Sequence, residues 1–199
     1  PLACALAARR WRYALTSLLA PGLALASPTG GNVVGGQAAI TAPNAATTVV
    51  NQASHSAVIQ WQSFDVGSQE YVIFNQPTAS AAVLNRVVGG DASSILGHLQ
   101  SNGRVFLVNP KGVLFGQGAV VNTGSLVAST LDIANADFLN DKFLLKAPTG
   151  GAGSVINNGS ITSANGGFVV LAGDYVRNAG VIPAQLGDVV LASGSAATL

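Results

Sequence analysis

The chain has 199 residues, of which 49% are hydrophobic and only 9% are charged, whereas roughly 25% are charged in an ordinary soluble domain. This composition argues against long surface helices, because their outer faces need Glu, Lys and Arg for solvation. Short runs of Val, Ile and Phe separated by Gly and Asn instead predict an all-β protein.

The start of the chain has the pattern of a secretory signal. A basic cluster at Arg9–Arg12 precedes the apolar stretch Ala14–Ala26. The small residues Ala24 and Ala26 occupy the two positions that a signal peptidase reads, which predicts cleavage before Ser27. A membrane anchor is the alternative, although the stretch is short for a bilayer and a Pro-Gly pair interrupts it.

Removal of this segment would leave six basic residues, eight acidic residues and no cysteine, because Cys4 precedes the cleavage site. The resulting net charge of about −2 leaves no basic surface, so we expect no binding of nucleic acid. An exported protein without disulfides either has a large core or stays unfolded on its way. We therefore divide the chain into a signal peptide, residues 1–26, and a β domain, residues 27–199.

The first half of the β domain has irregular strand signals. The run Asn32–Ile40 predicts a capping strand for the exposed first edge of a repetitive sheet. The run Trp61–Pro77 predicts two strands around a Gly-Ser pair at 67–68. Its candidate core residues are Val66, Val72, Ile73 and Phe74. The run Asp91–Leu99 predicts one helical turn with Asp91 as its N-cap.

The second half repeats with a period near twenty residues. The segment Gly167–Ala172 recurs as Gly187–Ala192, twenty residues later. The pattern Asn-x-Gly-x-aliphatic begins three times, at Asn122, Asn157 and Asn178. The last gap of 21 residues fits the period, and the first gap of 35 is close to two periods. An excursion at Asp132–Phe143 would account for that irregular gap.

A period near twenty with short strands is typical of a parallel β-solenoid. Three strands and three turns form one coil, and coils stack about 4.8 Å apart. An Asn repeated at one corner can form an amide ladder with its counterparts. About 170 residues would form roughly eight coils. The repeat continues to Leu199 and the chain has no Met, so we expect a fragment of a longer protein with further coils after it.

One stretch, "VFLVNPKGVLFGQG" at Val105–Gly118, interrupts an apolar run with a rigid turn. In a β-turn, Pro110 would fix φ at the first central position, Asn109 would cap the turn through its side chain, and Gly112 would complete it. Two interpretations stay open. The turn is a sharp corner of the solenoid, or it is a surface that a partner protein contacts.

A second candidate site is the pair Asn85 and Arg86. Arg86 is one of only six basic residues after the predicted cleavage site. Its side chain either packs on the surface and pairs with a nearby acid, or it contacts a partner protein.

Enzyme and metal sites have weak sequence support. The two histidines, His55 and His98, lack the spacing of metal ligands, and the sequence contains neither a Gly-x-Ser-x-Gly elbow nor a phosphate-binding loop. Three acids near the excursion could suggest calcium, although their spacing fits no known loop: Asp132, Asp137 and Asp141. We therefore predict no cofactor, no metal and no catalytic residues.

A β-helix that binds or cleaves glycans is the alternative function. Polysaccharide-cleaving enzymes of this shape group their acids on one face, whereas the eight acids here are scattered along the sequence. Trp61 is the only tryptophan after the signal segment, which leaves little aromatic surface for a sugar.

The stretch from Asn32 to Leu191 resembles the N-terminal secretion domain of the filamentous-haemagglutinin family, the exoproteins of two-partner secretion. The similar motifs are "WQSFDVG", "FNQP", "VLNRVVGGDASSILGHLQSNGRVFLVNPKGVLFGQGA" and "ADFL". The segment Asn109–Val113 is similar to the family's Asn-Pro-Asn-Gly-Ile and departs from it at two positions. Lys111 replaces Asn, and Val113 replaces Ile.

The resemblance implies a right-handed parallel β-helix with N-terminal capping strands and short antiparallel hairpins outside the helix. It also implies a dedicated partner, an outer-membrane β-barrel transporter with periplasmic POTRA domains. The domain would cross a Gram-negative outer membrane unfolded, fold outside and nucleate folding of a secreted or cell-surface adhesin-like exoprotein. Host or bacterial cell-surface receptors would bind the downstream part. The implied recognition or folding motif is Asn109, Pro110, Gly112 and Val113, with Asn85 and Arg86 as secondary candidates.

Overall fold

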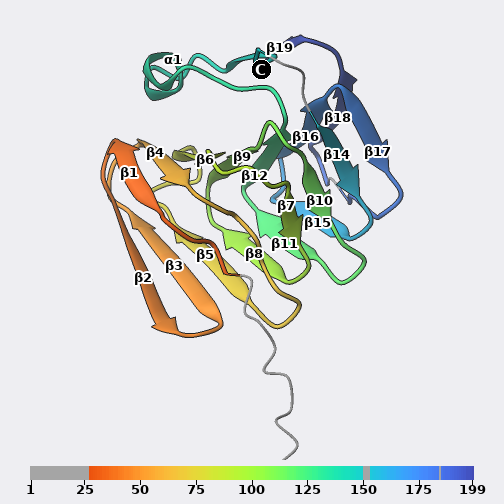
Figure 1. Cartoon of the computed structure of the whole chain (residues 1–199). Helices are drawn as coiled ribbons and strands as arrows, with labels where there is room; N and C mark the ends of the chain where they lie inside the picture. The colour runs from red at the N-terminus through yellow and green to blue at the C-terminus, as the bar shows by residue number, and fades with distance from the viewer. Residues whose placement is uncertain (1–26, 150–152, 184) are drawn as a thin grey trace, which may run out of the picture.

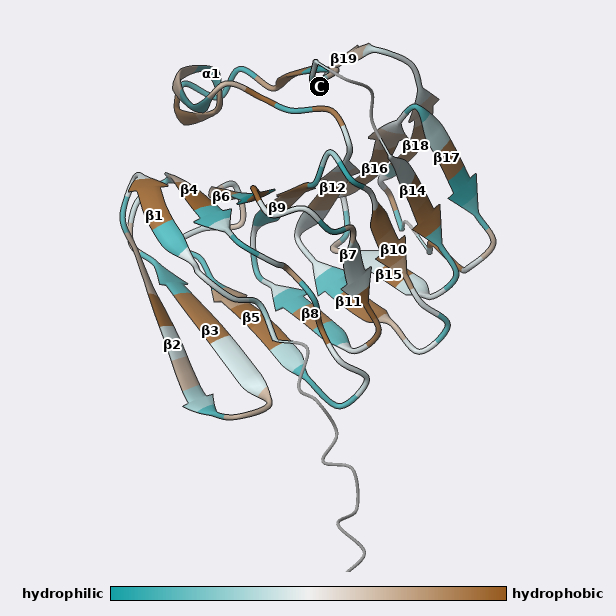
Figure 2. Ribbon diagram, in the orientation of Figure 1, coloured by the Kyte–Doolittle hydropathy of each residue, from teal (hydrophilic) through white to brown (hydrophobic). Residues whose placement is uncertain are grey.

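The strands of this chain wind into a parallel β-helix of three long sheets, with one short helix outside it (Figure 1). The computed structural model describes residues 27–149, 153–183 and 185–199, so the whole predicted signal segment, residues 1–26, lies outside the described residues. Apolar residues recur along the strands (Figure 2), and the pleat places one set of their side chains inside the helix. The predicted all-β parallel solenoid is confirmed.

A seven-stranded sheet runs along the whole helix, and its strand order is β1-β4-β6-β9-β12-β16-β18. Its strands are β1 (Asn32–Gly35), β4 (Ser56–Trp61), β6 (Ala82–Val87), β9 (Arg104–Val108), β12 (Ser125–Ser129), β16 (Phe168–Gly173) and β18 (Asp188–Ser193). All neighbours pair in parallel except β1, which pairs with β4 antiparallel.

Two further sheets complete the walls. A six-stranded sheet contains β2 (Ala38–Asn44), β3 (Thr47–Gln52), β5 (Tyr71–Asn75), β8 (His98–Ser101), β11 (Val120–Thr123) and β15 (Ser160–Ser163). A four-stranded sheet contains β7 (Ser93–Ile95), β10 (Val113–Phe115), β14 (Ser154–Asn157) and β17 (Tyr175–Asn178). Outside the helix lie α1 (Asn135–Leu139) and an antiparallel pair, β13 (Leu144–Lys146) with β19 (Ala196–Thr198).

The helix has about six coils, one for each parallel strand from β4 to β18, rather than the eight that the period predicts. The difference has two causes. Residues 32–52 form the cap and the first strand of the six-stranded sheet. Leu126 pairs with Val169, 43 residues later, because the predicted excursion lengthens that coil.

Two of the predicted repeats stack in register, and one Asn of the Asn-x-Gly pattern lies on a different sheet. Phe168 pairs with Asp188 and the register continues in step along both strands. Asn157 pairs with Asn178, and its side-chain Nδ2 donates to the Asn178 Oδ1 at 2.8 Å, which confirms an amide ladder there. Asn122 is not part of this ladder, because it lies on β11 in the six-stranded sheet. The gap of 35 residues therefore joins two different walls.

The N-terminal cap has two strands, as the resemblance implies, and the run Asn32–Ile40 holds β1 and the start of β2 instead of one strand. Gly36, with a φ of 70°, separates β1 from β2 in a left-handed conformation that glycine adopts freely. The cap strand β1 covers the edge of β4, and β2 forms an antiparallel hairpin with β3. The cap thus closes the first edges of two sheets, which would otherwise offer unpaired backbone groups to other chains.

The predicted helical turn at Asp91–Leu99 is wrong. This segment contains β7 and the start of β8. Pairing overrides the local helix signal, because Ser93 pairs with Val113, and Ile95 lies between Val66 and Phe115 in the four-stranded sheet.

Buried side chains form two separate clusters. The interior of the helix contains Trp61 and Phe64 in edge-to-face contact, with ring centroids 5.5 Å apart. The core positions predicted around them are confirmed for three residues: Val66, Val72 and Phe74. Ile73 is the exception, since it lies between two inward residues and is only half-buried on the outer face. The second cluster lies outside the seven-stranded sheet.

Glycines stack at the corner between the six-stranded and seven-stranded sheets. A Cβ added at Gly124 would lie 2.7 Å from the Gly103 carbonyl oxygen. A Cβ at Gly167 would lie 2.0 Å from the Gly124 oxygen, and one at Gly187 would lie 1.9 Å from the Gly167 oxygen. The corner therefore lets coils stack at strand spacing only while these positions carry no side chain.

The substitution Gly167→Ala is expected to lower the free energy of unfolding by about 1–3 kcal/mol, because the added methyl overpacks backbone. Gly194→Ala is the matched control, since an added Cβ there meets nothing within 4 Å. Urea unfolding followed by circular dichroism measures both. Equal stability of the two variants would contradict the stacking argument.

Candidate functional site

Asn109 lies at the corner between β9 and β10, and its side chain is fully buried. Its Nδ2 donates to the Asp91 carbonyl oxygen and to the Ser93 Oγ, each at 3.0 Å. Its Oδ1 accepts the backbone N–H of Lys111 at 2.9 Å. Both ends of the amide are therefore used inside the protein, and the interpretation of this turn as a solenoid corner has direct geometric support.

The backbone of the same turn joins the coils on either side. The Asn109 N–H donates to the Ser129 oxygen at 2.9 Å in the next coil, and its carbonyl accepts the Gly112 N–H at 3.0 Å. The Gly112 carbonyl accepts the Ser93 N–H at 3.0 Å, and the Pro110 carbonyl accepts the Gly153 N–H at 2.7 Å. The corner thus connects residues from before and after it in the chain.

The rest of the motif is equally constrained. Gly112 has a φ of 127°, where a side chain would be strained, and its Cβ would lie 3.0 Å from the Ser154 oxygen. Val113 begins β10 and is buried. Pro110 is half-buried, so Lys111 is the one exposed residue in the segment Asn109–Val113. A partner of the folded domain could contact little of the motif besides Lys111.

Asn85 and Arg86 are neighbours in β6 but lie on opposite faces of it. Asn85 is fully buried inside the helix, where its Oδ1 accepts the Trp61 indole N–H at 3.0 Å. Its Nδ2 donates to the Phe106 carbonyl oxygen at 3.3 Å. Asn85 therefore satisfies the only polar atom of the largest core side chain.

Arg86 lies on the outer face of β6 with only 12% of its side chain exposed. Its Nε donates to the Asp132 Oδ1 at 2.8 Å. Its two terminal nitrogens donate to the Asn135 Oδ1 and to the Ile133 carbonyl oxygen. All three acceptors belong to the excursion, so the interpretation of Arg86 as a surface ion pair is supported, with an added role as its anchor.

We name the excursion, residues 131–147, the strap. Its apolar side chains cover the outer face of the seven-stranded sheet, including Phe106, and are Leu131, Ile133, Phe138, Phe143 and Leu145. Phe106 packs against Phe138 and Phe143 with ring centroids 5.1 and 4.8 Å apart. The strap therefore encloses the second hydrophobic cluster.

The strap also runs lengthwise along the helix (Figure 1). At one end α1 contacts β4, and a Cβ built on Gly35 in the cap would lie 3.1 Å from the Leu139 Cδ1. At the other end β13 pairs with β19, which follows the last coil. An antiparallel bridge between Asp132 and Lys146 closes the base of the strap. This segment is antiparallel and lies outside the helix, as the resemblance implies.

The remaining predicted sites are distributed as follows. Ala24 and Ala26 lie outside the described residues, and Ser27 is the first residue described. The three acids considered for calcium do not converge, and no group of three or more His, Cys, Asp or Glu in the described ranges could hold a metal ion. Within the same ranges, no helix has the length and apolar character needed to cross a membrane.

The other polar candidates have structural contacts. The His55 Nε2 lies 3.3 Å from the Asp141 Oδ2, and the His98 ring stacks on the ring of Tyr71. Arg104 lies over the Phe143 ring, with its Cζ 5.3 Å from the ring centroid. The contacts of His55 and Arg104 hold the part of the strap around Asp141 and Phe143, and the stacked rings join β5 to β8 in the six-stranded sheet.

Comparison with known proteins places this geometry in a family. A family model described as the TPS secretion domain matches residues 24–199. A heme/hemopexin-binding protein of Haemophilus influenzae is 41% identical over 175 residues, which cover 84% of this chain and 19% of that protein. A second heme/hemopexin-binding protein of this species is 48% identical over 84 residues, 42% of this chain and 9% of that protein.

A solved structure matches as well. The crystal structure of the HMW1 secretion domain from Haemophilus influenzae has a TM-score of 0.81 and 35% sequence identity, and the match covers 86% of this chain and 46% of that chain. The chain thus spans less than half of the HMW1 chain and about a fifth of the longer-matching heme/hemopexin-binding protein.

The substitution Arg86→Ala is expected to free the strap, because it removes three charge-assisted hydrogen bonds. We expect a loss of about 2 kcal/mol in the free energy of unfolding, together with faster proteolysis within residues 131–147. Arg177→Ala is the control, since Arg177 is exposed on β17. Limited proteolysis with mass spectrometry measures the cleavage sites, and unchanged strap cleavage in Arg86→Ala would contradict the anchoring role.

Proposed function

The chain belongs to the TPS secretion domain family, and from this membership we propose how its geometry serves export. The chain is the secretion domain of a two-partner-secretion exoprotein. We infer that its partner is a cognate outer-membrane transporter, whose periplasmic POTRA domains bind the chain before it folds. The exoprotein then leaves the cell through the outer membrane of a Gram-negative bacterium.

The burial of Asn109 carries this proposal. Its amide has three partners inside the folded domain and no exposed surface. A transporter that recognises Asn109 must therefore meet the chain while it is unfolded. The two interpretations of the motif then apply at different times, first as a recognition segment in the periplasm and later as a corner outside the cell.

Folding outside the cell would make export directional. The Asn109 corner needs Asp91 and Ser93 from the preceding segment and Ser129 and Gly153 from the following one. It can close only after all of these have left the transporter. A closed corner and a covered second core then oppose return of the chain, and the stacked coils offer a template for the residues that follow.

The activity of the whole exoprotein belongs to its downstream part. The relatives are heme/hemopexin-binding proteins, which suggests a downstream part that binds heme or hemopexin. We assign the domain itself no catalytic role. Two of its acids serve the fold, since the Asp65 carboxylate accepts the Ser94 N–H and the Glu70 carboxylate accepts the Gly67 N–H, each at 2.8 Å.

The substitution Asn109→Ala is expected to reduce export at least tenfold when the chain is produced with its cognate transporter. It removes the amide that the transporter recognises and also leaves the Ser93 hydroxyl without its partner. Gly167→Ala is the control for stability, because it weakens the fold and keeps the motif. Lys111→Asn, an exposed change toward the family pattern, should leave export unchanged.

Immunoblotting of culture medium and cells measures the exported fraction of each variant, and circular dichroism of purified chain measures its fold. Equal export of Asn109→Ala and Gly167→Ala would assign Asn109 to folding alone. Export without any transporter would refute the two-partner mechanism.

The periplasmic part of the transporter is expected to bind the unfolded chain and not the folded one. Chain diluted from urea immediately before mixing should be retained on immobilised POTRA domains, whereas chain that has already refolded should pass through. Asn109→Ala should weaken retention of the unfolded chain. Equal retention of the folded and unfolded chain would contradict recognition before folding.

A further inference from the structure

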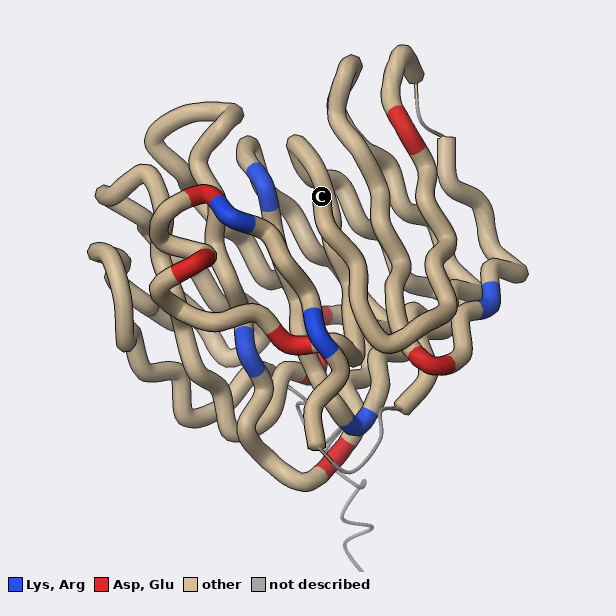
Figure 3. The backbone as a smooth tube through the Cα atoms, turned by 90° about the horizontal axis from the view of Figure 1, so that it is seen from above, with Lys and Arg blue, Asp and Glu red and all other residues tan. Residues whose placement is uncertain are grey.

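The outer face of the six-stranded sheet carries no formal charge. None of its strands contains Asp, Glu, Lys or Arg, and all six lie within the described ranges. Charged residues lie elsewhere, among them the acids and lysines along the strap, which faces the viewer in Figure 3. An extended uncharged surface of this kind favours a neutral partner, because a charged one would lose hydration there without gaining a counter-charge.

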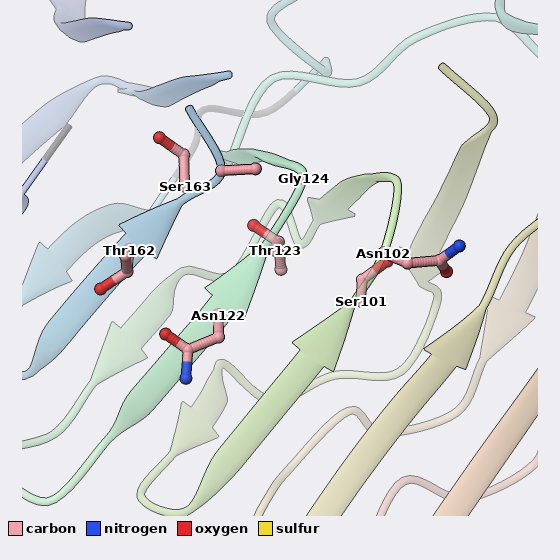
Figure 4. A pocket seen from close by; sticks show the side chains of 8 residues that line it. Ser101, Asn102, Asn122, Thr123, Gly124, Thr162 and Ser163 are labelled. Carbon is pink, nitrogen blue, oxygen red and sulfur yellow. The ribbon is translucent and has the colours of Figure 1, made fainter. Parts of the chain in front are cut away.

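A row of polar side chains crosses this face along the helix axis. Asn122 pairs in register with Gln100 on one side and with Thr162 on the other. Adjacent strands lie about 4.8 Å apart, so the row is about 10 Å long. Figure 4 shows Asn122 and Thr162 on one side of their strands and the buried residues Thr123 and Ser163 on the other.

The side chains of this row are not used by the fold. Gln100, Asn122 and Thr162 form no side-chain hydrogen bond with any described residue. Other amides on the helix do form hydrogen bonds between coils; for example, the Asn75 Nδ2 donates to the Asn51 Oδ1 at 2.8 Å. An amide offers two donors and one acceptor oxygen, so the row presents unused donors and acceptors at fixed spacing.

Two adjoining hollows lie over this row. One of about 280 Å³ is lined by residues of β8, β11 and β15, and one of about 480 Å³ is lined by residues of β5, β8 and β11. The residues common to both are Ser101, Asn102 and Asn122. The hollows therefore adjoin as one shallow, open groove along the carboxyl ends of four neighbouring strands.

One aromatic pair, outside the lining of both hollows, lies at the amino ends of β5 and β8. The rings of Tyr71 and His98 stack with centroids 4.4 Å apart and planes 5° apart, and Tyr71 is 39% exposed. The rings offer apolar surface near one end of the polar row, because His98 and Gln100 lie two residues apart on the same face of β8. This combination of apolar contact and neutral hydrogen-bonding groups is the one that suits a sugar, which has both C–H and hydroxyl surfaces.

We propose that this groove binds a neutral oligosaccharide, with Gln100, Asn122 and Thr162 as the hydrogen-bonding residues. Binding without cleavage is expected, because glycoside hydrolysis needs a pair of carboxylates and these six strands contain none. The site exists only in the folded domain, so it acts outside the cell after export. It is independent of the proposed transporter recognition, which concerns the unfolded chain.

The test is binding of the purified folded chain to an array of neutral oligosaccharides beside sialylated, sulfated and uronate-containing ones. We expect retention on a subset of the neutral sugars. The double variant Gln100→Ala/Asn122→Ala should lower the affinity at least tenfold. Gln117→Ala, an exposed amide in the turn between β10 and β11, should bind as the unchanged chain does.

Chemical-shift mapping by NMR with the best neutral sugar provides a readout that needs no variant. Shifts confined to β5, β8, β11 and β15 would support the groove. The proposal is overturned if no neutral sugar binds, if only acidic sugars bind, if Gln117→Ala loses binding equally, or if the shifts lie on another face.

Discussion

Every coil of this β-helix must pass each corner within one strand spacing of the coil before it. That constraint explains residues that otherwise look unrelated. Gly124, Gly167 and Gly187 stack where a Cβ would overlap a carbonyl oxygen. Asn109 solves the opposite problem. At its corner the Asp91 carbonyl, the Ser93 hydroxyl and the Lys111 N–H need hydrogen-bond partners, and the Asn109 amide bonds to all three. Where side-chain atoms would overlap, the chain uses glycine, and where polar groups would be orphaned, it uses asparagine.

The same constraint limits what the domain can show to a partner after folding. A residue that makes a corner possible is buried by the coils that stack on it, as Asn109 and Asn85 are. Recognition of such residues and formation of the fold therefore exclude one another in time. In the export mechanism that we propose, the transporter recognises the unfolded chain and the chain folds outside the cell, which would separate the two events and let one short motif serve both.

The low charge of the chain has a related origin. A solenoid of short strands has little surface that needs charge for solubility, because Ser, Thr, Asn and Gln solvate the outer faces. One outer face is apolar instead, and the strap covers it with three of its large side chains, Phe138, Phe143 and Leu145. Arg86 holds the strap through three acceptors. The uncharged face of the six-stranded sheet is left open, and its unused amides distinguish it from the amides that hold coils together.

The sequence by itself determined the architecture. The recurrence of Gly167–Ala172 as Gly187–Ala192 revealed a period of twenty residues. A β-helix pairs residues one coil apart, so this period also predicts the pairing of Asn157 with Asn178. Only the tertiary structure decided which wall each segment joins. Asp91–Leu99 became strands, and Asn122 fell on a different wall from Asn157, because register depends on the lengths of turns and of the strap. Asn85 and Arg86 are adjacent but have different roles, because neighbouring side chains of β6 point to opposite faces. Asn85 lies in the core and Arg86 lies beneath the strap.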